Sequence, residues 1–185
     1  MRTLRTELDQ IFGEIVIRID SGSGFVDVRS SAIPVATLLR RGGTKAHPDT
    51  RIGCRNERDL TLRIGGTEAR IAPASAGISR RSYRVDVEIH SVAYRLVPDG
   101  PGSSALSRNG RRIGRMWADH DGGAWAEWIH FRRLESNDAS LVTEHIEYGD
   151  VQPTDATIGY LLAAAYGTGA PARWELLLRG LLSLG

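Results

Sequence analysis

Much of the chain alternates apolar with polar residues at a period of two, which is typical of strands with one face in a core and one in water. The clearest example is residues 83–90, where four apolar side chains alternate with four polar ones. Further strands are expected within residues 14–20, 25–29, 33–39, 60–64, 67–71, 94–97, 104–108, 111–117, 124–131 and 141–148. The predicted fold class is therefore mostly β, a barrel or roll of about ten to twelve antiparallel strands, and α+β by count.

Glycine-containing turns separate these runs. The segment Asn109-Gly110 predicts a tight hairpin with positive φ angles, and Asp121-Gly122-Gly123 predicts another. Residues 41–59 are polar and contain several glycines, so they are expected to form a long loop.

The pattern changes near the C-terminus, where residues 156–166 are almost entirely apolar. A helix here has no polar face and must be buried on all sides. Asp155 is the expected N-cap and Gly167 the expected C′ residue. Pro171 then begins a second, amphipathic helix that extends to about residue 184.

At the other end of the chain, Leu4, Leu8, Ile11 and Phe12 fall at helical spacing, so residues 3–12 predict a short helix. No internal repeat or linker is visible, and residues 1–185 are interpreted as a single domain. Its expected parts are an N-terminal helical segment (1–12), a β meander (13–150) and a C-terminal helical hairpin (155–184).

The composition is that of an ordinary globular protein, with 41% hydrophobic and 25% charged residues among 185. Lys45 is the only lysine among 24 basic residues, yet the net charge is only +2. This small excess does not favour nucleic acid as a partner. The chain has a single cysteine and no apolar leader, and its apolar tail is too short to span a bilayer. These features predict a cytoplasmic protein without a transmembrane segment.

A meander of about a dozen strands followed by an apolar helix resembles the tubby C-terminal-like superfamily, which includes LURP-one-related proteins and phospholipid scramblases. The segments that carry the likeness are 94–97 (Tyr-Arg-Leu-Val), 108–114 (Arg-Asn-Gly-Arg-Arg-Ile-Gly), 124–128 (Ala-Trp-Ala-Glu-Trp) and 155–165. The resemblance implies a closed barrel with the hydrophobic helix through its middle. The chain lacks a lysine-rich patch, which departs from the phosphoinositide-binding tubby proteins. It is also similar to actinobacterial proteins, a bacterial likeness that implies no activity.

Arginine and tryptophan come together around the last predicted hairpin. Because Trp125 and Trp128 lie on opposite faces of one strand, we expect Trp125 to face the core and Trp128 to be partly exposed. Exposed tryptophan beside arginine is common at binding surfaces. The predicted binding surface consists of Arg111, Arg112, Arg115, Trp128, Arg132 and Arg133, with Arg80 and Arg81 as further candidates.

Candidates for catalysis and metal binding are isolated in the sequence. Cys54, flanked by arginines and near His47, is a candidate nucleophile without an identified base. The segments 119–121 (Asp-His-Asp) and 144–147 (Glu-His-Ile-Glu) hold metal-ligating types, but adjacent residues rarely converge on one ion. We therefore predict no catalytic residue, no metal and no cofactor.

Three functions remain open at this stage. The first is a non-enzymatic binding or assembly module that contacts a protein partner, or itself, through the arginine and tryptophan surface. The second is a barrel that binds an anion or lipid headgroup through Arg80, Arg81, Arg111, Arg112, Arg132 and Arg133. The third is an enzyme that uses Cys54, which has the least support.

Overall fold

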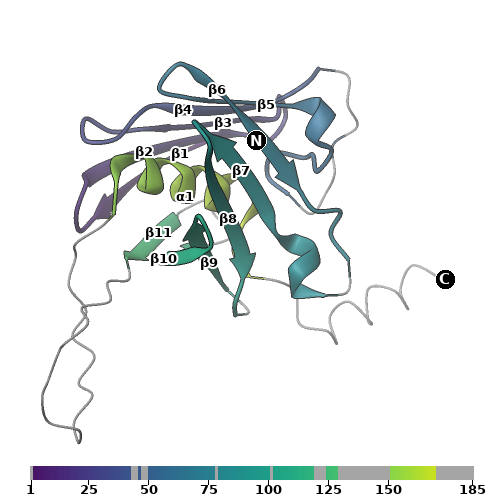
Figure 1. The fold of residues 1–185 in the computed structure, drawn as a ribbon. Coiled ribbons are helices and arrows are strands. Elements are labelled where there is room, and N and C mark those ends of the chain that lie inside the picture. The colour runs from purple at the N-terminus through teal and green to yellow at the C-terminus, as the bar shows by residue number, and fades with distance from the viewer. Residues whose placement is uncertain are drawn as a thin grey trace, which may run out of the picture.

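A nearly closed barrel of antiparallel strands surrounds one helix in the computed structural model (Figure 1). The structure describes residues 2–42, 46, 50–77, 79–100, 102–118, 124–128 and 151–169. Within these residues, each strand pairs with the next one along the chain, so that eleven strands form a simple meander. The mostly β fold class predicted by the alternating pattern is confirmed.

The strands are β1 (Arg2–Asp9), β2 (Gly13–Asp20), β3 (Phe25–Arg29), β4 (Ala36–Arg40), β5 (Leu60–Ile64), β6 (Thr67–Pro73), β7 (Val85–Ile89), β8 (Val92–Pro98), β9 (Ser103–Arg108), β10 (Arg111–Ala118) and β11 (Ala124–Trp128). The helices are η1 (Glu57–Asp59), η2 (Arg80–Tyr83), both of them 3₁₀, and α1 (Pro153–Tyr166).

The inner face of the barrel carries the apolar members of the alternating runs. On β2, for example, Ile15, Ile17 and Ile19 are buried, whereas Glu14 and Arg18 are exposed. The Asn109-Gly110 turn between β9 and β10 has φ angles of 50° and 80°. These positive angles fit the tight hairpin expected from the sequence, because they match the twist of the flanking strands.

The helix α1 occupies the interior of the barrel. Every residue from Asp155 to Tyr166 is buried, as the absence of a polar face predicted. Figure 1 shows α1 beneath β1–β4, with β8–β11 on its other side. A methyl group added at Gly159 would lie 3.0 Å from the Met116 sulfur and 3.1 Å from a Leu106 methyl, so the helix and the barrel wall are in close contact.

The N-terminus of α1 is fixed by a buried carboxylate. Asp155 accepts hydrogen bonds from the Tyr94 hydroxyl at 3.0 Å and from Arg108 Nη1 at 2.7 Å. It also accepts one from the backbone N–H of Gln152 at 2.8 Å. Gln152 is the N-cap, and Asp155 is the third helical residue of a capping box. The prediction that Asp155 is the N-cap is therefore wrong, because the helix begins three residues earlier than expected.

A second buried carboxylate, that of Asp9, joins three elements. One of its oxygens accepts hydrogen bonds from the Tyr160 hydroxyl of α1 at 2.7 Å and from Trp128 Nε1 of β11 at 3.0 Å. The other oxygen accepts the backbone N–H groups of Ile11 and Phe12 at 2.8 and 3.0 Å. No backbone ladder joins β1 to β11 among the described residues, so these side chains close the barrel at its seam.

The C-terminus of α1 is covered by the loop before η1. The backbone N–H of Ile52 donates to the Ala165 carbonyl at 3.0 Å, and Arg51 Nη1 donates to the Ala164 carbonyl at 3.4 Å. These bonds satisfy carbonyls that have no partner within a helix, and the arginine charge suits the negative end of the helix dipole. Gly167 ends the helix with a φ of 74°, as expected from its position in the sequence.

The N-terminal helix predicted for residues 3–12 is wrong, because Arg2–Asp9 form β1. Leu4 and Leu8 are four residues apart, a spacing that places two side chains on one side of a helix and equally on one face of a strand. The predicted strand at 141–148 and the predicted second helix from Pro171 lie outside the described residues. The β meander thus begins at residue 2 rather than at residue 13.

Replacing Tyr160 with phenylalanine should lower the free energy of unfolding by about 1.5–3 kcal/mol, because it removes a hydrogen bond to a buried carboxylate. Urea unfolding followed by tryptophan fluorescence measures this loss. Tyr83→Phe is the control, since this ring lies outside the barrel interior, and its change should stay within about 0.5 kcal/mol. Equal stability of wild type and Tyr160→Phe would show that the Asp9 bond does not hold the helix.

Candidate binding surface

The outer face of β9–β11 carries a cluster of arginine and tryptophan side chains, which we call the Arg/Trp surface: Arg112, Arg115, Trp117 and Trp125, with Asp99 beside them. Strand alternation directs Trp117 outward from β10, because the neighbouring Met116 is buried in the core. Trp125 and Glu127 face outward from β11 in the same way. The register pairs Trp117 with Trp125 and Arg115 with Glu127.

A β-bulge brings the two arginines to the same face. Arg112 and Arg115 are three residues apart, so in a regular strand they would point to opposite faces. The pairing of β10 with β9 shifts by one residue between Arg112 and Gly114. The extra residue in this interval restores a common direction for the two arginines.

Asp99, just after β8, holds both arginines. Its Oδ2 accepts Arg112 Nη2 at 2.6 Å and Arg115 Nε at 2.9 Å, and its Oδ1 accepts the Ser103 hydroxyl at 2.7 Å. Partial burial opposes ionisation, but the bonds from Ser103 and Arg115 and the charges of both arginines outweigh it. The pKa of Asp99 is therefore lowered, and the carboxylate stays charged at neutral pH.

The aromatic part of the surface is a stack. The Trp117 and Trp125 rings lie 6.3 Å apart between centroids and are nearly parallel, at 4°. The Arg115 guanidinium lies 5.8 Å from the Trp117 ring centroid. Trp125 is 45% exposed, so one large ring with a fixed orientation is presented to solvent.

The prediction for the tryptophans on β11 was reversed. Trp128 is 2% exposed and packs edge-to-face against Phe12 with its indole N–H bonded to Asp9, so it belongs to the core and not to a binding surface. Trp125 takes the exposed place. The alternating pattern shows that Trp125 and Trp128 point to opposite faces of β11, but it does not show which of these faces contacts the helix.

The remaining candidate arginines are distributed over the molecule. Arg111 is exposed beside the β9–β10 turn, and Arg81 is exposed on η2. Arg80 also lies on η2, whereas Arg132 and Arg133 lie outside the described residues. The structure therefore brings together Arg112 and Arg115 of the predicted set.

Asp99 and the pairing of Trp117 with Trp125 were missed in the sequence. Asp99 was visible as one residue of a Pro- and Gly-rich turn. The sequence could have predicted the tryptophan pair, because Trp117 and Trp125 are each four positions from Asp121, at the start of the predicted Asp-Gly-Gly turn. Residues equidistant from a hairpin turn face each other across the two strands.

Cys54 is 3% exposed, which removes it as an accessible nucleophile in this conformation. Its sulfur contacts the backbone of Asn56 at 3.4–3.5 Å, and the proposed partner His47 lies outside the described residues. Within the part of the chain that the structure describes, no three His, Cys, Asp or Glu residues are grouped for metal binding. The segments 119–121 and 144–147 lie outside that part.

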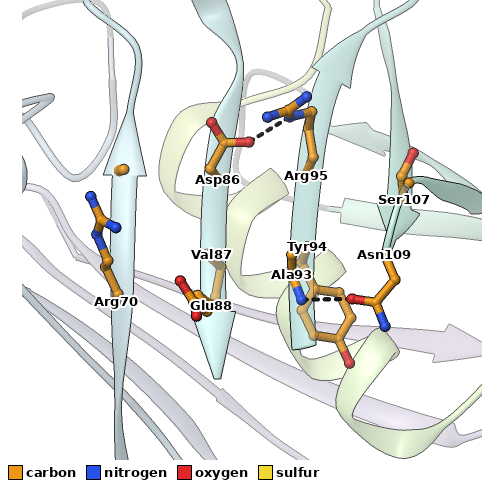
Figure 2. Close-up of a pocket in the computed structure, with 11 residues that line it drawn as sticks. Arg70, Asp86, Val87, Glu88, Ala93, Tyr94, Arg95, Ser107 and Asn109 are labelled. Atoms are coloured by element: carbon orange, nitrogen blue, oxygen red, sulfur yellow. Dashed lines mark hydrogen bonds and ion pairs between the residues drawn. The ribbon is translucent and has the colours of Figure 1, made fainter. Parts of the chain in front are cut away.

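A hollow of about 500 Å³ lies on the outer face of β6–β9 (Figure 2). Small side chains such as Ala72 and Ala93 line it together with charged ones. Two of the charged groups are matched already, since Arg95 Nε donates to Asp86 Oδ1 at 2.5 Å. Tyr94 also borders the hollow, but its hydroxyl is directed inward to Asp155. Charge matching leaves this hollow less suited to a charged ligand than its lining suggests.

The protein is thus an antiparallel β-barrel filled by a central helix, and it carries the Arg/Trp surface on its outer face. No protein-family model, curated protein or solved structure matches this chain. Among the described residues, no helix has the length and apolar character needed to cross a bilayer.

Replacing Asp99 with asparagine should lower the free energy of unfolding at neutral pH by about 0.5–1 kcal/mol, because two partly exposed ion pairs are lost. Since the folded pKa is lowered, the difference from wild type is fully present above the ordinary aspartate pKa of about 3.9 and shrinks as the pH falls through the folded value. Urea titrations between neutral and acidic pH measure it. A difference that persists below that range would contradict the ion-pair account.

Proposed function

We propose that this protein is a non-enzymatic binding module that contacts a protein partner through the Arg/Trp surface. The observation that carries the proposal is the exposed Trp125 ring, held in place by stacking on Trp117. Tryptophan and arginine are the residue types most enriched among the few that dominate binding energy at protein interfaces. A ring that is already ordered loses little conformational entropy when a partner covers it.

The arrangement of charges indicates what the partner presents. Arg112 and Arg115 share the Asp99 carboxylate, which holds both guanidinium groups in position, and Glu127 lies opposite Arg115 on β11, so the charges on this face are nearly balanced. An apolar side chain of the partner would cover Trp125, and a carboxylate at the rim would meet the remaining guanidinium donors. The expected partner is therefore a protein with an apolar surface and a few polar groups around it.

Binding of an anion or lipid headgroup has less support. A phosphate would have to compete with Asp99 for Arg112 and Arg115, at distances of 2.6 and 2.9 Å. The enzyme alternative has less support still, because the Cys54 thiol is buried.

Two expectations from the sequence stay predictions. Membership of the tubby C-terminal-like superfamily is one, since a barrel around a helix can be shared without shared function or descent. A cytoplasmic location is the other.

Site-specific photocrosslinking tests the proposed surface. A photoreactive amino acid at position 127, in place of the exposed Glu127 on the same face of β11 as Trp125, should crosslink a specific protein in extracts of the source cells. Trp125→Ala should weaken binding of the identified partner by at least about tenfold, as expected for a central interface tryptophan.

Val35→Ala is the control, because Val35 is 44% exposed and lies just before β4, outside the Arg/Trp surface. Its affinity for the partner should equal that of the wild type, as measured by calorimetry. If Trp125→Ala and Val35→Ala bind equally well, or if phosphate or anionic lipid displaces the partner at low concentration, the surface does not have the proposed role.

A further inference from the structure

A second apolar surface lies on the outer face of β1–β4. Among the described residues, the exposed large apolar side chains are Leu4, Leu8, Ile11, Val35, Leu39 and Trp125. All except Trp125 come from the first four strands and their turns. Leu4 and Leu8 on β1 are 63% and 84% exposed, although leucine is among the residues most often buried.

The register of β1 and β2 gives this face an ordered charge pattern. Leu4 pairs with Arg18, and Leu8 pairs with Glu14, with Thr6 and Val16 midway between them. Arg18 and Glu14 are both exposed. Four residues apart on a strand, they are separated by about 13 Å, so they are too distant to form an ion pair within one chain. Asp27 of β3 lies opposite Arg18 but is already bonded to Arg29 and Thr37. Each end of the face thus has a leucine beside one exposed charge, positive at Arg18 and negative at Glu14.

We propose that the outer face of β1 and β2 binds a second copy of this chain in a two-fold symmetric dimer. A two-fold axis that lies in the interface, crosses the strands and passes near Thr6 and Val16 exchanges the two ends of the face. It places Leu4 against Leu8 of the second copy, and Arg18 against Glu14 of the second copy. Each contact occurs twice, as symmetry requires, and the two sheets pack face to face.

The charge pattern selects a second copy over other partners. A uniformly acidic or basic partner would match one end of the face and repel the other. An anionic membrane would be repelled at the Glu14 end. A copy of the same face, rotated by 180°, matches both ends.

The face can also extend beyond two strands. A hollow of about 550 Å³, lined in part by Leu4, Phe25 and Leu39, continues it across β3 and β4. Specific dimers bury roughly 800 Å² on each subunit, which requires contact over more strands than β1 and β2 alone. The apolar part of this lining, beside the Arg2–Asp20 ion pair, supplies further surface for that contact.

Sedimentation velocity over a wide range of protein concentration tests the dimer. The wild type should shift from the 20.2 kDa monomer to twice that mass as concentration rises. Arg18→Glu and Glu14→Arg should each weaken dimerisation by at least about tenfold, because each places like charges together at two symmetric contacts. The double variant R18E/E14R should restore it, since the exchanged charges again meet opposite charges.

Two further variants separate this proposal from the Arg/Trp surface and from misfolding. Trp125→Ala should dimerise like the wild type, whereas Leu8→Asp, at a position that is 84% exposed, should remain folded by circular dichroism and be monomeric. A wild type that stays monomeric at all concentrations would overturn the proposal. So would a double variant that stays monomeric, loss of the dimer in Trp125→Ala, or vesicle binding that depends on Arg18 in a monomeric protein.

Discussion

The structure depends on enclosing a helix that has no polar side. Residues 155–166 are all buried, and an apolar surface of this size is stable in water only when other parts of the chain cover it. The barrel provides that cover with the inward side chains of successive strands. Because Gly159 lies against Met116 and Leu106, the fit leaves no room for a larger side chain at that position without movement of the wall.

Enclosure creates a second requirement, since every polar group taken inside needs a partner. Asp155 and Asp9 meet it by accepting several hydrogen bonds each, and their tyrosine partners remain protonated donors. Burial and the neighbouring carboxylates raise the pKa of Tyr94 and of Tyr160. Asp155 also suits the positive end of the helix dipole, and Arg108 balances its charge. The two carboxylates thereby fix the register of the helix and close the seam between β1 and β11.

Since the helix fills the interior, the side chains that partners can reach lie on the outer face of the barrel. Two outer regions differ in character. The Arg/Trp surface is ordered by a bulge in β10 and by Asp99, whereas the β1–β2 face is ordered by the hairpin register alone. The two regions lie on different strands, β9–β11 and β1–β2, which meet at the seam between β1 and β11.

The sequence by itself determined the strands, their turns and the buried helix, because period-two alternation, the Asn109-Gly110 turn and the apolar run 156–166 are local signals. It did not determine β1, since Leu4 and Leu8 have a spacing that suits both a helix and a strand. Nor did it determine whether Trp125 or Trp128 faces the core, because alternation sets opposite faces without assigning either one. Only the tertiary structure decided these points, together with the Asp99 contacts and the Asp9 seam. Those depend on which strands meet across the barrel, and residues such as Asp9, Trp128 and Tyr160 come together from distant parts of the chain.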